Sequence, residues 1–181
     1  MATAGMIATA DQLLRASEIG RCELVAGELR MMSPAGFRHG VVTARIAAAM
    51  ASHTEPRCLG TVLAAETGFL IARDPDTVRA PDVAFVRTAR LAAGMPTGFF
   101  VGPPDLAVEV LSPSDRPGDT SARIDDWLRA GTQQVWVVDP EARTLVVYRQ
   151  GEAPTAFSGH ESVLGEAVIP GFALPLDRVF V

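Results

Sequence analysis

The sequence contains no lysine, since all 16 of its basic side chains are arginines. Only the amine of the first residue can therefore supply an ammonium group to a functional site. The 21 acidic side chains outnumber the arginines and leave a formal net charge of −5. A net negative domain is a poor default binder of nucleic acid, so nucleic-acid binding would require a local basic patch.

Long apolar runs and cysteines are also scarce. No apolar stretch reaches the roughly 18 residues, free of charge, that a membrane-spanning helix needs. Residues 1–16 lack the positive start and continuous apolar segment of a secretory signal. Cys22 and Cys58 are too few for a disulfide framework and are expected to be free thiols in a reducing compartment. We expect a cytoplasmic protein with no membrane partner.

The size and composition favour one folded domain over residues 1–181, with a helical lead-in at 1–17. A chain of 181 residues lies in the single-domain range, and a hydrophobic share of 48% argues against disorder. Helical patterns begin with the capping box Thr9-x-x-Gln12 and continue over 37–51 and 119–130, where Asp119 is the expected cap.

Strand patterns alternate with these helices. The expected strands are 22–25, 28–32, 58–64, 67–72, 83–87, 105–111, 134–138 and 144–149, and residues 155–181 are expected to hold short strand-like pieces. The Gly- and Pro-rich stretch 88–104 is expected to be a loop with at most a short helix at 88–93. This order of elements predicts an α/β or α+β fold, with a mixed sheet and helices packed on it.

Two carboxylates interrupt otherwise apolar strands. Asp82 begins the strand at 83–87, and Glu109 lies within 105–111 on the same face as Ala107 and Leu111. Such a carboxylate needs an arginine partner, an edge position or several donors. As a pair on adjacent strands, the two acids could instead converge on Mg²⁺ or Mn²⁺, which prefer oxygen ligands.

Around these two acids the sequence resembles the Uma-type putative restriction endonuclease family of the PD-(D/E)XK nuclease superfamily. The matching stretches are 23–29, Met32-Ser33-Pro34 followed by His39, Glu66-Thr67-Gly68, Pro81-Asp82-Val83, 105–114, Ala130-Gly131, 135–140 and Pro170-Gly171-Phe172. The resemblance implies a restriction-endonuclease-like core with a central mixed sheet, flanking helices and extra β-hairpins. It also implies that Asp82 and Glu109 bind the metal, with the Val110 carbonyl as third ligand.

The sequence departs from that pattern at the basic residue. Leu111 stands where the superfamily has lysine, and alignment on Ala130-Gly131 places Arg123 where the Uma-type branch has its lysine. Arginine keeps its charge and can contact a phosphate with two hydrogen bonds, but it cannot accept a proton near neutral pH. The resemblance also indicates Glu28 and His39 as auxiliary contacts to the metal or to water.

The first hypothesis is a Mg²⁺- or Mn²⁺-dependent endonuclease acting on DNA, as a homodimer because duplex cleavage needs two centres. The alternative is a nuclease-fold protein with weakened or lost turnover that serves as a binding or assembly module, which the absent lysine and the acidic net charge favour. A phosphodiesterase acting on RNA or a small nucleotide is a third option, although the sequence has no RNA-recognition signature.

Overall fold

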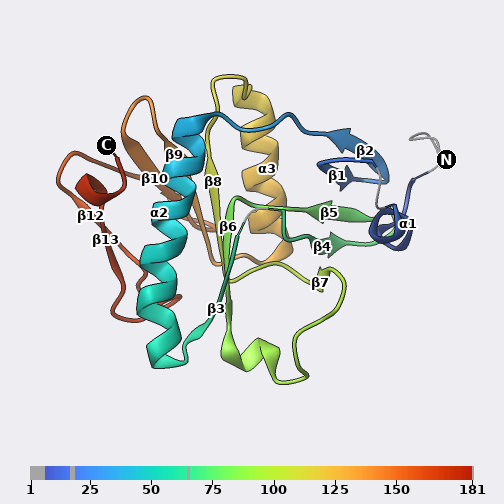
Figure 1. The fold of residues 1–181 in the computed structure, drawn as a ribbon, viewed down its shortest axis with the longest axis horizontal. Coiled ribbons are helices and arrows are strands. Elements are labelled where there is room, and N and C mark those ends of the chain that lie inside the picture. The colour runs from blue at the N-terminus through green and yellow to red at the C-terminus, as the bar shows by residue number, and fades with distance from the viewer. Residues whose placement is uncertain (1–6, 17–18, 65, 181) are drawn as a thin grey trace.

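Figure 1 shows the fold in a computed structural model, which describes residues 7–16, 19–64 and 66–180. Of the predicted lead-in, the structure describes the short helix α1 (Ala10–Arg15), while residues 1–6 and 17 lie outside the described residues. Thr9 and Gln12 form the predicted capping box, with each side chain bonded to the other residue's main-chain N–H.

The central sheet contains six strands in the order β11-β10-β9-β8-β6-β3. Their bounds are β3 (Gly60–Ala64), β6 (Val83–Arg87), β8 (Leu106–Val110), β9 (Gln134–Asp139), β10 (Thr144–Tyr148) and β11 (Thr155–Ser158). β8 and β9 are parallel, and the other neighbours are antiparallel. The sheet is therefore mixed, and the predicted fold class is confirmed.

A second sheet has the order β2-β1-β5-β4-β7. Its strands are β1 (Cys22–Val25), β2 (Glu28–Met31), β4 (Phe69–Ala72), β5 (Thr77–Arg79) and β7 (Phe100–Val101), and a separate hairpin joins β12 (Ser162–Leu164) to β13 (Ala173–Pro175). Ala26 and Gly27 both have positive φ, which the tight turn between β1 and β2 requires. The sequence analysis missed β5 and β7 because strands of three and two residues are too short to show an alternating pattern.

The described residues also form two long helices, α2 (Phe37–Thr54) and α3 (Pro117–Ala130), and the 3-10 helices η2 (Glu55–Arg57), η3 (Thr88–Leu91) and η4 (Leu176–Arg178). α3 begins two residues before the predicted cap, because Pro117 occupies the first helical position, where its fixed φ is favourable. Gly131, at φ 106°, ends the helix as predicted. Within the described part of the chain, no helix combines the length and apolarity needed to cross a membrane.

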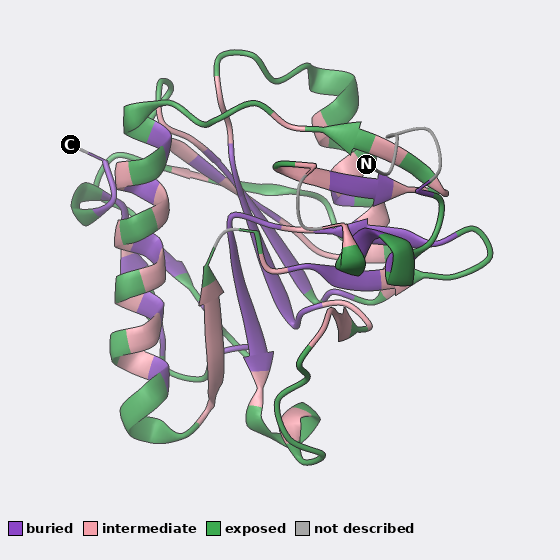
Figure 2. Ribbon diagram, turned by 45° about the vertical axis from the view of Figure 1, so that its right-hand side comes forward, coloured by how far each residue is buried: buried purple, intermediate pink, exposed green. Residues whose placement is uncertain are grey.

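The central sheet lies between α2 and α3, and Figure 2 shows buried residues along its strands. The α2 face contains Val83, Phe85 and Val108, packed with the buried side chains of α2. The α3 face contains Ala84 and Ala107, packed with the buried side chains of α3. Because successive strand residues face opposite sides, this arrangement places side chains 82 and 109 on the α3 face.

Candidate active site

Asp82 and Glu109 lie opposite each other at the junction of two central strands. β6 and β8 are antiparallel with Val83 paired to Val108, so the next position in register places Asp82 beside Glu109. Cross-strand neighbours project to the same face of a sheet. Asp82 is 5% exposed and Glu109 is 3% exposed, so both carboxylates depend on partners within the protein.

The partners of Asp82 come from three directions. Its Oδ2 accepts a hydrogen bond from the Val110 main-chain N–H at 2.8 Å and lies 3.1 Å from Nε2 of His39, in the first turn of α2. Its Oδ1 lies 3.6 Å from Nη2 of Arg21. The sequence analysis had proposed His39 for this site, and the structure brings it there, whereas Arg21 was not predicted.

Glu109 receives both of its partners from α3. Its Oε1 accepts the indole N–H of Trp127 at 2.7 Å, and its Oε2 accepts a hydrogen bond from Nη1 of Arg123 at 2.9 Å. Burial raises the pKa of Glu109 from 4.5 to about 7. The positive charge of Arg123 opposes this rise, but the nearby negative charges of Asp82 and Glu23 add to it.

Helical periodicity explains why α3 supplies several members of the site. Asp126 and Trp127 follow Arg123 by three and four residues, so both lie next to it on the surface of the helix. Burial alone would lower the pKa of Arg123, but the surrounding acids, Glu109 first among them, raise it above the usual arginine value. The guanidinium is therefore a permanent cation at the centre of the acidic cluster.

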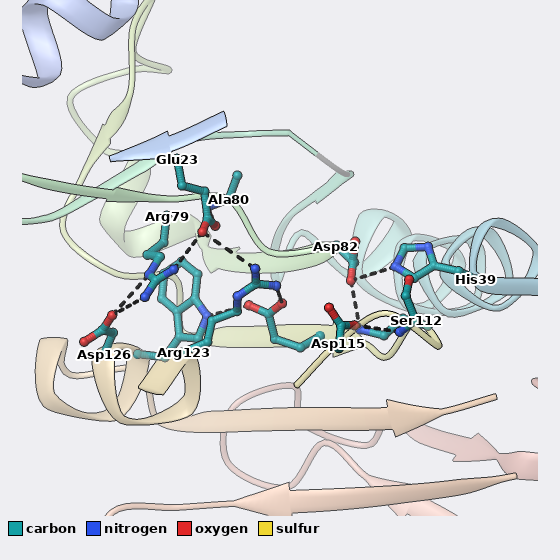
Figure 3. A network of polar contacts seen from close by, with 12 residues as sticks. Glu23, His39, Arg79, Ala80, Asp82, Ser112, Asp115, Arg123 and Asp126 are labelled. Carbon is teal, nitrogen blue, oxygen red and sulfur yellow. Dashed lines mark hydrogen bonds and ion pairs between the residues drawn. The ribbon is translucent and has the colours of Figure 1, made fainter. Parts of the chain in front are cut away.

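Glu23 on β1 is a buried acid of the site that the sequence analysis missed. It is 2% exposed, accepts the Ala80 main-chain N–H at 3.0 Å and receives Nη1 of Arg79 at 2.7 Å. Nη2 of Arg123 lies 3.7 Å from the same Glu23 oxygen. Figure 3 shows Glu23 contacting Arg79 on one side and Arg123 on the other. An acid within an apolar strand, the signal that identified Glu109, was present here too.

Glu28, by contrast, does not lie in this cluster, so its predicted role as an auxiliary contact is not supported. Its side chain is 71% exposed and forms an ion pair with Arg30 at 2.8 Å. The reason is its position: β2 is the edge strand of the second sheet, whereas β1 lies between β2 and β5. The hairpin therefore contributes Glu23 rather than Glu28 to the site.

The site offers two carboxylates, which are part of the ligand set that a hard divalent ion needs. Asp82 and Glu109 offer the oxygen ligands of Mg²⁺ or Mn²⁺, ions that often keep several waters beside one or two carboxylates. No group of three His, Cys, Asp or Glu side chains that could hold a metal ion is found among the described residues. Since both Glu109 oxygens accept hydrogen bonds, the residues fit a two-carboxylate site once Arg123 releases Oε2.

Comparison with known proteins agrees with this architecture. The Uma2 family model, described as "Putative restriction endonuclease", matches residues 9–177. The fold is similar to a crystal structure from Anabaena variabilis ATCC 29413 described as a putative nuclease belonging to DUF820, with a TM-score of 0.83 and 21% identity over 95% of this chain and 97% of that chain. A search of curated proteins gives no match. From the extent of the family match, the chain belongs to the Uma2 family of putative restriction endonucleases.

Proposed function

We propose that this protein is a metal-dependent phosphodiesterase that cleaves DNA. The observation that carries the proposal is the presence of two buried carboxylates at neighbouring strands of the central sheet: Asp82 directly precedes β6 and Glu109 lies within β8, one position beyond the pair Val83–Val108. Asp82 and Glu109 would hold Mg²⁺ or Mn²⁺, with the Val110 carbonyl as a further ligand. When bound, the ion would activate a water molecule and neutralise the negative charge on a phosphoryl oxygen.

The protein's own side chains divide the remaining tasks. Arg123 supplies a permanent positive charge and a planar fork of donors, which suit it to bind and orient a phosphate group in place of the usual lysine. Because arginine does not lose its proton, a carboxylate or His39 must accept any proton that the reaction releases. Asp82 holds His39 through Nε2 and so fixes the orientation of the imidazole.

DNA is the proposed substrate because the family description names restriction endonucleases, enzymes that act on DNA. The acidic composition requires that binding depend on local arginines rather than on the overall charge. A homodimer is proposed for duplex cleavage, since one centre would be needed for each strand.

The test is incubation of the purified protein with plasmid and with single-stranded DNA, in Mg²⁺, in Mn²⁺ and in EDTA. We expect cleavage with either metal and none in EDTA. Asp82→Asn and Glu109→Gln keep the side-chain size and should each reduce cleavage at least 100-fold, in line with the usual effect of removing groups that stabilise the transition state. Glu152→Gln, at an exposed acid, is the matched control and should cleave like the wild type.

A second function is favoured by the hydrogen bonding of Glu109. Both of its oxygens are engaged, and one partner is an arginine rather than lysine. This arrangement also suits a nuclease-fold protein that has lost turnover and acts as a binding or assembly module. DNA that stays intact under every metal condition, while the folded protein still binds it, would contradict the first proposal and support the second.

A further inference from the structure

Charges of alternating sign run through the site. Glu109 contacts Arg123, Arg123 lies beside Glu23, and Glu23 contacts Arg79, which in turn is bound by Asp126. Figure 3 shows the part of this row that runs from Arg123 through Glu23 and Arg79 to Asp126, residues of α3, β1 and β5. Each buried acid in the row thus has a guanidinium neighbour, as buried charges require.

The two arginines are held very differently. Arg79 is nearly buried, donates to Asp126 through both Nε and Nη2 at 3.1 and 2.6 Å, and donates to Glu23 at 2.7 Å. Arg123 has one short contact, at 2.9 Å to Glu109, and a loose one at 3.7 Å to Glu23. Its side chain is also 24% exposed, against 9% for Arg79. Arg79 is therefore fixed, whereas Arg123 can move toward solvent by breaking one close contact.

We propose that Arg123 is a resident cation of the carboxylate site, which competes with a divalent ion for Oε2 of Glu109. The inference rests on the proposed function, because it concerns the same two-carboxylate site. Without metal, the guanidinium neutralises Glu109 and adds to the neutralisation of Glu23. If Asp82 and Glu109 held an ion, its positive charge would disfavour the nearby guanidinium, and Arg123 would give up its hydrogen bond to Oε2 of Glu109.

This competition gives Arg123 two positions with different uses. When the ion displaces it, the guanidinium is released on the solvent-exposed side of α3, where its donors are free for a phosphate group. Glu109 stays oriented because the indole N–H of Trp127 holds its other oxygen, Oε1. Metal binding and exposure of the phosphate-binding group are thereby coupled through one hydrogen bond.

The test is Mn²⁺ binding measured by isothermal titration calorimetry at pH 8.0, without DNA. Arg123→Met removes the competitor and keeps a helix-forming side chain of similar length. We expect it to bind Mn²⁺ at least tenfold more tightly than the wild type, a gain of about 1.4 kcal/mol. Arg21→Met is the matched control, because it also removes a positive charge from the site. Arg21 lies 3.6 Å from Asp82 and does not occupy an oxygen of Glu109.

The control separates displacement from simple loss of charge. Arg21→Met should gain threefold or less, since the competitor for Glu109 remains. An unchanged affinity of Arg123→Met, or an equal gain in both variants, would overturn the inference and leave the metal-dependent nuclease proposal intact. Absence of Mn²⁺ binding in all three proteins would overturn the metal site itself. If Arg123→Met does not fold, Arg123→Lys, which keeps the charge but not the fork of donors, should show a smaller gain, and no gain would overturn the inference.

Discussion

Replacing Glu109 with glutamine should change how the stability of the protein depends on pH. Burial raises the pKa of Glu109 to about 7, so the folded state binds this proton more tightly than the unfolded chain does. The wild type therefore has the full stabilisation from this proton below pH 4.5 and loses it as the pH rises toward about 7. Glutamine resembles the protonated acid in shape and charge but does not titrate.

The size of the effect follows from the rise in pKa. A change from 4.5 to about 7 corresponds to about 3 kcal/mol of unfolding free energy, and most of it falls between pH 5 and pH 8. The wild type should therefore lose about 2 to 3 kcal/mol relative to Glu109→Gln across this interval. The comparison removes the contribution of the titrating groups that do not interact with Glu109, because both proteins share those groups.

Urea unfolding in EDTA at pH 5, 6, 7 and 8, followed by tryptophan fluorescence, measures this difference. Trp127 and Trp136 are fully buried, so unfolding exposes both indoles. Parallel stability profiles for the two proteins would refute the reasoning. That result would mean that Arg123 keeps Glu109 ionised over the whole range, and that its charge outweighs the cost of burial.

Four further substitutions test the burial, hydrogen bonding and packing seen in the structure, each by urea unfolding. Glu23→Gln should lower the free energy of unfolding by about 3 kcal/mol, because it breaks a buried ion pair. Glu28→Gln, on the exposed strand of the same hairpin, should lower it by less than about 0.5 kcal/mol. Equal losses would contradict the distinction between the two acids. Trp127→Phe should lower the free energy of unfolding by about 1 to 3 kcal/mol, because it removes the N–H that donates to Glu109 while keeping an aromatic ring. An unchanged stability would show that this hydrogen bond contributes nothing. Gly60→Ala should lower the free energy of unfolding by at least about 1 kcal/mol, because the added Cβ would collide with the main-chain oxygen of Val86 and would lie 2.6 Å from the ring of Phe85. A neutral result would mean that the backbone of the paired strands and the ring both shift without cost.

Much of the site was visible in the sequence because burying a charge leaves a local pattern. Asp82 and Glu109 each interrupt an apolar strand, and this pattern needs no knowledge of the partner. Glu23 carries the same pattern, yet the interpretation favoured Glu28 from the same hairpin. Glu23 lies on a strand inside the sheet, whereas Glu28 lies on the edge strand. The neighbouring strand β5, which makes β1 an inner strand, is too short to be recognised from its residues.

The sequence by itself determined the order of helices and strands, the two interrupting acids and the lack of any lysine to serve them. These follow from short-range periodicity and composition, which each segment carries whatever its neighbours are. Only the tertiary structure decided that Asp82 faces Glu109, that Arg123 and Trp127 share the oxygens of Glu109, and that Arg79 anchors Glu23. Such partners are remote in sequence, and strand register and helix rotation, which the global packing sets, bring them together.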